Sequence, residues 1–289
     1  MLHHFQFAFT PVEILWTLTF AAQLVLLVVL LGRERMARFP WFSTSIILIG
    51  LRLLIARLLV DRLPRLTFGA IMITLADVGV MVSALVLVEI ARKVFRGARR
   101  ASWMAATLVM LAVGGLVLRF WGAWPPWQTL TANSKLAALL FMQLAGQKGD
   151  LLIAVVTIQL GVLVALFGRS RGVGWHSHTQ RIMIGLSTVA LSQLGVQAFI
   201  ELLARHVAPK TRPEYDHLLD LADRVANAEK AVFLLVLVWW IAALWKDEPG
   251  TPPARESKAE GAPPATELPN DSVDLAKDQP DANSATQES

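Results

Sequence analysis

Cysteine is absent from this 289-residue sequence, and the sequence motifs of several common enzyme classes are missing as well. Without cysteine the chain forms no disulfide, thiolate metal site, iron-sulfur cluster or cysteine nucleophile. The HExxH motif of zinc proteases and the nucleophile elbow of serine hydrolases are absent as well. No histidine lies within the apolar stretches, which argues against haem inside a membrane. We therefore predict that the protein is not an enzyme and has no cofactor.

Apolar residues dominate what is present, because 55% of the sequence is hydrophobic, too much for an ordinary soluble domain. Most of the apolar segments approach the length that an α-helix needs to cross a bilayer. They predict an all-α, polytopic membrane protein, a bundle of seven transmembrane helices, in a domain covering residues 1–246. The predicted spans are about 12–32, 43–60, 68–91, 102–121, 151–168, 182–204 and 231–245.

Two amphipathic stretches precede predicted spans. TANSKLAALLFMQLAGQK lies before the fifth span, and EYDHLLDLADRVANAEK lies before the seventh. Such stretches either extend the following helix beyond the membrane or lie flat in its interface. The sequence leaves both readings open.

Charge is divided between two parts of the chain. Residues 247–289 hold three basic and ten acidic residues together with seven prolines, a composition that predicts a disordered acidic tail. The first 246 residues hold 24 basic and 12 acidic residues. In a membrane protein such a basic excess is typical of loops that fix orientation against anionic lipid. We therefore expect the lipid bilayer, and no nucleic acid, as a partner.

Basic loops predict the orientation of the spans. RERMAR, RKVFRGARR and GRSRG follow the first, third and fifth spans, so all three fall on one side of the membrane if seven spans alternate. The side rich in Lys and Arg is the cytoplasm. The prediction is an N terminus outside and a C-terminal tail inside, in the cell inner membrane. FWGAWPPWQ then lies in an outer loop, where interfacial tryptophans are expected.

An internal repeat is a further hypothesis. QLVLLVVLLGRER begins at Gln23 and QLGVLVALFGRSR begins at Gln159, and each is followed by a tryptophan, Trp41 or Trp175. Spans one to three would then be a parallel copy of spans five to seven, with the fourth as linker. This layout resembles the three-one-three topology of small sugar transporters of the SWEET type. All fourteen prolines lie outside the seven segments, so the resemblance implies that layout without proline hinges.

Polar residues inside the predicted spans are the candidate ligand-binding residues, because a charged group in the bilayer needs a partner, water or a place inside the bundle. At a rise of roughly 1.5 Å per residue, four of them lie roughly 14 to 16 Å from the cytoplasmic end, and the others lie farther out. This distribution predicts a polar pocket that opens outward. The candidates are Gln23, Arg52, Gln159 and Gln193 near the middle, and Arg57, Asp77, Gln197 and Glu201 farther out.

Asp77 is expected to have a buried partner, and Arg57 matches it in depth. Arg52 is the second candidate for that ion pair. Each candidate also has an interpretation without a ligand: Arg57 can reach the headgroups, and Glu201 can reach the outer interface. Gln193 and Gln197 can hold helices together by hydrogen bonds of about 1 kcal/mol each.

Two other groups of polar residues are interpreted without a metal. His176 and His178 are two residues apart, so they do not share a helical face, and their surroundings predict a helix start. Three aspartates at 216, 220 and 223 are spaced to form one solvated helical face. Seven spans also resemble microbial rhodopsins, in which a lysine in the last helix holds retinal. Here the middle of that helix reads FLLVLVWW, so no retinal is expected.

Three functions stay open on the sequence. The preferred one is a receptor-like sensor or signalling module that binds a small polar ligand from outside and reports to a cytoplasmic or membrane protein partner. A small-solute transporter with the three-one-three repeat is the first alternative. The second is a non-catalytic scaffold or accessory subunit, in which the polar groups hold helices together.

Overall fold

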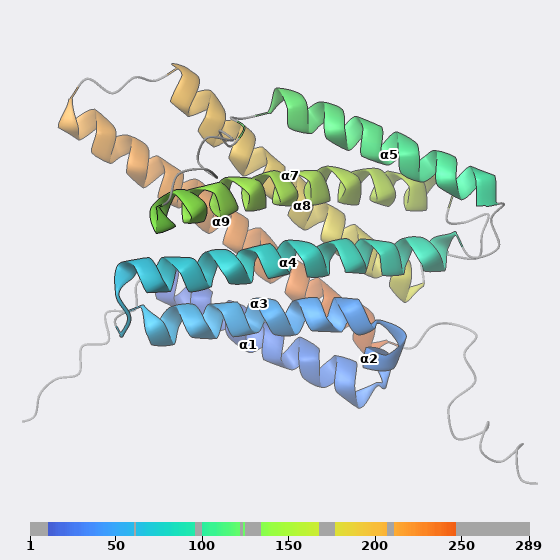
Figure 1. Cartoon of the computed structure of the whole chain (residues 1–289). Helices are drawn as coiled ribbons and strands as arrows, with labels where there is room; N and C mark the ends of the chain where they lie inside the picture. Colours follow the sequence, from blue (N-terminus) through green and yellow to red (C-terminus); the bar gives the residue numbers. More distant parts are fainter. Residues whose placement is uncertain are drawn as a thin grey trace, which may run out of the picture. The chain divides into compact units, whose positions relative to one another are not determined.

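The computed structural model describes residues 11–60, 62–95, 100–121, 124, 134–167, 177–206 and 211–246. The chain divides into two compact units, Met1–Pro249 and Gly250–Ser289, and every described residue belongs to the first. The predicted disordered tail and the loop with Trp175 and His176 lie outside the described residues. Within the described ranges all regular structure is helical (Figure 1).

Seven long helices and one short helix make up the described part. Their bounds are α1 Pro11–Gly32, α2 Arg35–Arg38, α3 Pro40–Leu59, α4 Arg65–Val94, α5 Arg100–Phe120, α7 Lys135–Phe167, α8 His178–His206 and α9 Arg212–Trp245. α7 and α9 begin well before the fifth and seventh predicted spans. Both amphipathic stretches therefore extend a helix, which confirms one of the two readings that the sequence left open.

Six of these helices are long and apolar enough to cross a membrane: α1, α3, α4, α7, α8 and α9. They support a helical, multi-pass membrane protein. The described apolar part of α5, Met104–Phe120, is shorter than the other six. The findings thus support six spans directly, whereas the sequence predicted seven.

The six long helices form a closed ring. α1 contacts α3, α3 contacts α4, α4 contacts α7, α7 contacts α8, α8 contacts α9, and α9 returns to α1. α5 lies outside this ring and packs along α7 (Figure 1). We call the end of the ring that carries α2 the α2 end, and the opposite end the far end. Consecutive long helices alternate in direction between these ends (Figure 1).

Buried residues gather toward the α2 end. With the exception of Thr19, every buried residue of the six ring helices lies at the helix midpoint or on its α2 side. The core there is apolar and includes several fully buried side chains, among them Leu30, Phe39, Phe42 and Leu244. In the far half of the ring, Thr19 apart, every side chain that the structure describes is at least partly exposed. The bundle is therefore tightly packed at the α2 end and loosely packed at the far end.

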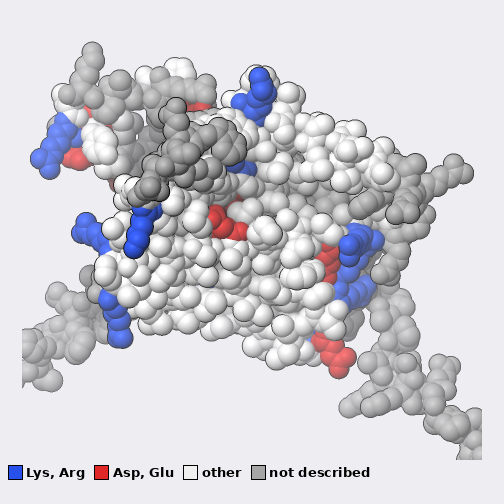
Figure 2. Space-filling model, viewed as in Figure 1, with Lys and Arg blue, Asp and Glu red and all other residues white. Residues whose placement is uncertain are grey.

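Charged side chains are sparse on the surface between the two ends. Figure 2 shows most of the Lys and Arg toward both ends of the visible face and one further basic group at its upper edge, while the wide band between the ends is otherwise uncharged apart from an acidic patch. Large apolar side chains such as Val28, Leu31, Met81 and Leu235 are more than two-thirds exposed. An uncharged belt with exposed apolar residues is the surface that contact with lipid requires.

Candidate functional site

A cavity of about 210 Å³ lies inside the helical ring. Five helices line it, and its wall runs from Trp240, near the α2 end of α9, to Asp150, near the middle of α7. At roughly 1.5 Å per residue, these two residues lie roughly 7 and 25 Å from the α2 ends of their helices. The cavity thus extends nearer to the α2 end than the sequence predicted, because the sequence placed the polar pocket in the middle and outer half.

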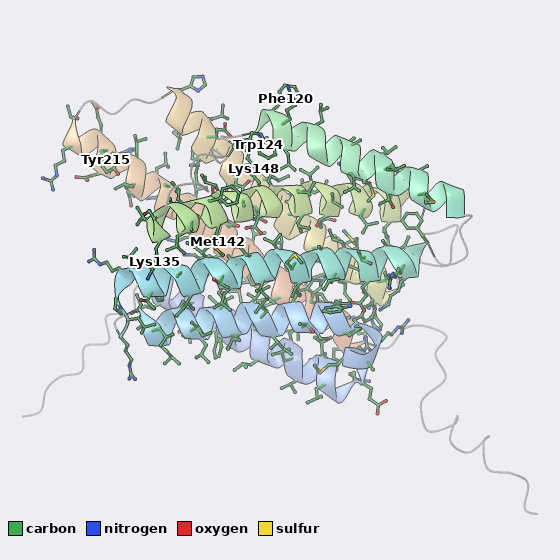
Figure 3. All side chains as sticks on the ribbon, in the orientation of Figure 1. Phe120, Trp124, Lys135, Met142, Lys148 and Tyr215 are labelled. Atoms are coloured by element: carbon green, nitrogen blue, oxygen red, sulfur yellow. The ribbon has the colours of Figure 1, made fainter. Side chains whose placement is uncertain are left out.

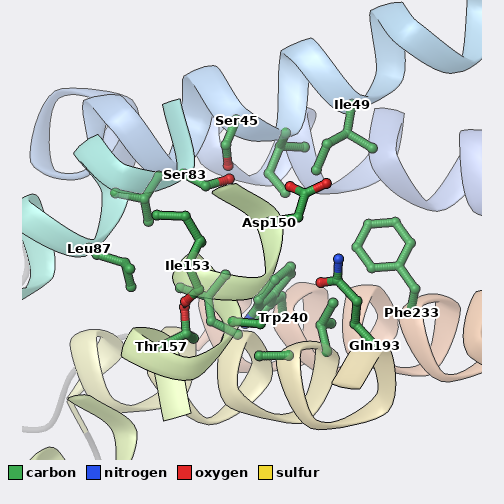
Figure 4. Close-up of a pocket in the computed structure, with 16 residues that line it drawn as sticks. Ser45, Ile49, Ser83, Leu87, Asp150, Ile153, Thr157, Gln193, Phe233 and Trp240 are labelled. Carbon is green, nitrogen blue, oxygen red and sulfur yellow. The ribbon is translucent and has the colours of Figure 1, made fainter. Parts of the chain in front are cut away.

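Polar groups converge on the cavity from different helices. Figure 4 shows the Asp150 carboxylate and the Gln193 amide directed into the same space from α7 and α8, with the ring of Phe233 beside them. The hydroxyls of Ser45 on α3 and Ser83 on α4 point toward one another nearby. The remaining wall is mostly aliphatic, so the cavity combines a few fixed polar groups with apolar surface, as small-molecule sites do.

Asp150 brings a negative charge into this wall. No hydrogen bond or ion pair reaches its carboxylate within the described part of the chain. Arg52 on α3 attracts it and Asp77 on α4 repels it over a longer range. Asp77 lies against α7 one turn from Asp150, because a methyl group on Gly146 would overlap its Oδ1 atom. Two carboxylates and one guanidinium therefore lie near the far end of the cavity.

Arg57 does not pair with Asp77. Its guanidinium lies 3.6 Å from a carboxylate oxygen of Glu13 on α1, and both side chains are about half exposed or more. The Asp77 Oδ1 atom is buried and has no hydrogen-bond partner within the described ranges. The expected ion pair is thus replaced by an exposed one between α1 and α3, which contributes about 0–1 kcal/mol.

The other predicted site residues are spread over several interfaces. Gln193 is the one member of the predicted set in the cavity wall. Gln23 is 1% exposed and faces Gly50 on α3, whose Cβ would lie 3.3 Å from its Oε1 atom. Gln159 on α7 is half-buried, and its Nε2 atom has no partner in the described part. Gln197 is half-buried on α8, one turn beyond Gln193 toward the far end, and Arg52 is exposed.

Glu201 lies at a second hollow near the far end, with a volume of about 330 Å³. Phe120 and Trp121, at the end of α5, line this hollow together with α8 residues. Lys148 of α7 attracts Glu201 and donates to the Leu118 and Trp121 carbonyls of α5. Its ammonium also lies 5.0 Å from the centre of the Trp124 ring (Figure 3). Lys148 therefore satisfies free carbonyls at the α5 C terminus and fixes α5 to the ring.

Polar contacts close the α2 end. Arg35 of α2 is buried against the ring of His178 on α8, and its Nη1 atom lies 3.0 Å from the Nδ1 atom of that ring. Its Nη2 atom donates a hydrogen bond to the Lys246 carbonyl. Arg181 donates to the Ala243 carbonyl at 2.8 Å. These contacts connect α2, α8 and α9 at the α2 end, next to the apolar core. His178 was interpreted as part of a helix start, and α8 does begin there.

Sequence reasoning missed most of the cavity wall. Asp150 stands directly before the predicted span 151–168, and neither it nor Ser45 nor Trp240 is among the candidates predicted from the sequence. A signal for Asp150 existed in the amphipathic stretch before it, which made a longer helix an open reading. Trp240 carried no signal, because a tryptophan in an apolar run is ordinary. Comparison of this chain with protein-family models, curated proteins and solved structures gives no match.

Proposed function

We propose that this chain is a receptor-like sensor or signalling module of the cell inner membrane that takes a small polar ligand into its central cavity from outside. The burial asymmetry of the ring supports this proposal. Packed apolar side chains close the α2 end, while the described side chains of the far half, Thr19 apart, are at least partly exposed. A solute can therefore approach Asp150 and Gln193 from the far end.

The proposed orientation places the α2 end in the cytoplasm and makes α5 a seventh span. Eight basic residues lie at described helix ends and turns of the α2 end, against two acids, Glu34 and Glu89, a basic excess that supports the cytoplasmic side. α5 has 21 residues, about 31 Å at 1.5 Å per residue, enough for a hydrocarbon core of about 30 Å. The basic residues are Arg33, Arg35, Arg38, Arg92, Lys93, Arg100, Arg181 and Lys246.

Signal output in this proposal depends on a partner. Ligand bound between α7, α8 and α9 would bias the packing of these helices, and α8 and α9 meet α2 through Arg35. A protein that contacts the α2 end, or the acidic sequence after it, would read that change. A ligand shifts such an equilibrium only by the difference in its affinity for the two packings.

Single cysteines test access to the cavity, because the natural sequence has none. We expect Gln193→Cys to react with a membrane-impermeant maleimide in spheroplasts, where the outer face of the inner membrane is exposed. The Leu237 side chain is 0% exposed and lies near the α2 end. Leu237→Cys should therefore react neither in spheroplasts nor in inside-out vesicles. The measurement is a gel shift after the remaining free thiols are labelled in denaturant.

Two exposed positions serve as orientation controls. Arg62→Cys at the far end should label in spheroplasts, and Ala37→Cys in α2 should label in inside-out vesicles. Labelling of Gln193→Cys only in inside-out vesicles, the preparation in which Ala37→Cys labels, would contradict the outward opening. If Gln193→Cys labels from neither side, the polar residues hold helices together, which is the scaffold alternative.

A small-solute transporter is the second candidate, and the order of the ring favours it. α1, α3 and α4 are consecutive in the ring, as are α7, α8 and α9, and the two groups meet through α4–α7 and α9–α1. Two equivalent three-helix halves with α5 as linker would give this arrangement. Alternating access then requires the α2 end to open at another stage of the transport cycle.

A measurement of solute flux distinguishes a transporter from a sensor. In proteoliposomes a transporter accumulates or exchanges a radiolabelled solute, whereas a sensor binds the solute without moving it. We expect binding without flux, because the α2 end is closed by packed side chains. Time-dependent uptake that Asp150→Asn abolishes would favour the transporter over the sensor.

A further inference from the structure

The cavity inside the ring has an unusual charge balance. Asp150 is the one ionisable side chain among the described residues that line it, and no lysine, arginine or histidine faces it there. Ser45 and Thr157 already donate their hydroxyl protons to carbonyls of their own helices, Phe42 and Ile153, at 2.8 and 2.6 Å. These hydroxyls therefore offer oxygen lone pairs to the cavity.

Charges beyond the wall do not neutralise Asp150 fully. Arg52 attracts its carboxylate, but Asp77 adds a second negative charge to the same neighbourhood. Arg52 is exposed and forms no ion pair with Asp150 within 4 Å in the described structure. The group of three thus carries one more negative than positive charge. A carboxylate held among apolar side chains is costly without a counter-charge.

The shape and chemistry of the wall distinguish a metal ion from an organic cation as a positively charged ligand for Asp150. The volume of about 210 Å³ is smaller than the pockets of about 300–1,000 Å³ that hold drug-sized ligands. Aliphatic side chains and the rings of Phe233 and Trp240 make up much of the wall. A hydrated metal ion needs several oxygen ligands at one point, whereas an alkylammonium ion needs one carboxylate and gains from aromatic faces.

We propose that the cavity binds a small organic cation, an ammonium with short alkyl groups, against Asp150. Gln193 accepts a hydrogen bond through its amide oxygen where the ammonium carries N–H groups, and Phe233 presents its ring to the alkyl groups. This inference rests on the proposed function, because it names the ligand class of the same cavity.

Cationic and anionic thiol reagents test the charge of the cavity without removing Asp150. The reagents are trimethylammonium-ethyl and sulfonatoethyl methanethiosulfonate, used on full-length Gln193→Cys in nanodiscs. Clefts of one charge raise the rate of oppositely charged reactants by about 10-fold or more. We expect the ratio of cationic to anionic rates at Gln193→Cys to exceed that at His206→Cys, an exposed site at the far end of the same helix, by about tenfold. Equal ratios at the two sites would overturn the proposal.

Binding is then measured with defined probes. Tetramethylammonium chloride should raise the unfolding midpoint of the purified chain in a saturable way, while equal sodium chloride should not. Asp150→Asn should weaken this binding by at least about tenfold, or about 1.4 kcal/mol. Asp223→Asn, an exposed acid on α9, should leave it unchanged. Phe233→Leu should weaken binding of tetramethylammonium without removing it.

The outcomes separate the two proposals. If cations bind equally well to Asp150→Asn, or if acetate or glycerol binds through Gln193 and cations do not, the cation inference fails and the proposed function stands. If Gln193→Cys reacts with neither thiol reagent, the cavity is inaccessible and the proposed function fails with it. Should Asp150→Asn fail to fold, the rate ratio at Gln193→Cys decides the inference alone.

Discussion

Replacement of Gly185 by alanine is expected to lower the free energy of unfolding by about 1–3 kcal/mol, the usual cost of overpacking a core. A Cβ on Gly185 would overlap the indole of Trp240, lying 2.8 Å from Cζ2 and closer to Nε1. Trp240 is 1% exposed and packs edge-on against Phe42 with ring centres 5.0 Å apart. The indole therefore has no room to retreat, and either α8 and α9 must separate or Trp240 must change rotamer.

Gly195 on the same helix provides the matched control. No atom lies within 4 Å of the position that its Cβ would occupy. Gly195→Ala should therefore stabilise the protein by up to about 1 kcal/mol, because alanine is the better helix former. The measurement is denaturant or thermal unfolding of both variants in one detergent. Equal stability of the two variants would show that Trp240 adapts at little cost and that the α2 end is less rigid than its burial indicates.

The helices could be predicted from the sequence because the length of apolar runs is a strong signal. The predicted spans for α1 and α3 lie within a few residues of the observed helices. The starts of α7 and α9 could not be fixed in this way, because amphipathic stretches form helices both inside and outside a membrane. Asp150 therefore stands at the edge of the predicted span 151–168, although it lies near the middle of α7.

The candidate site was harder to predict, because residue type does not show which way a side chain points. Matching depth alone selected Arg57 as the partner of Asp77, but Glu13 at the start of α1 lies nearer to Arg57. Gln23 and Gln193 lie at similar predicted depths, yet Gln23 faces α3 and Gln193 faces the cavity. The ring order of the helices decides between these directions, and that order arises from contacts far apart in the sequence.

Removal of the Glu89 carboxylate is expected to cost about 3 kcal/mol of unfolding free energy, as for a buried charged group that satisfies several donors. Glu89 is 8% exposed on α4 and accepts the backbone N–H groups of Trp41 and Phe42, at 3.1 and 3.2 Å. It thus caps the first turn of α3 from a neighbouring helix, where these donors have no partner within their own helix. Lys93 adds an ion pair at 3.2 Å. Glu89→Ala, followed by denaturant unfolding in detergent, measures the loss.

Glu89→Gln separates the cap from the ion pair. The amide oxygen of glutamine still accepts from the α3 backbone, so this variant should lose only about 1 kcal/mol, the value of a partly exposed pair. Asp223→Ala, at an exposed acid of α9, should change stability by less than about 0.5 kcal/mol. Because α3 also carries Ser45 of the cavity wall, a loosened first turn should open the α2 end. Leu237→Cys should then label in inside-out vesicles when combined with Glu89→Ala and stay unlabelled with Glu89→Gln. A large loss of stability without new labelling would mean that Glu89 holds α3 locally and does not keep the cavity closed.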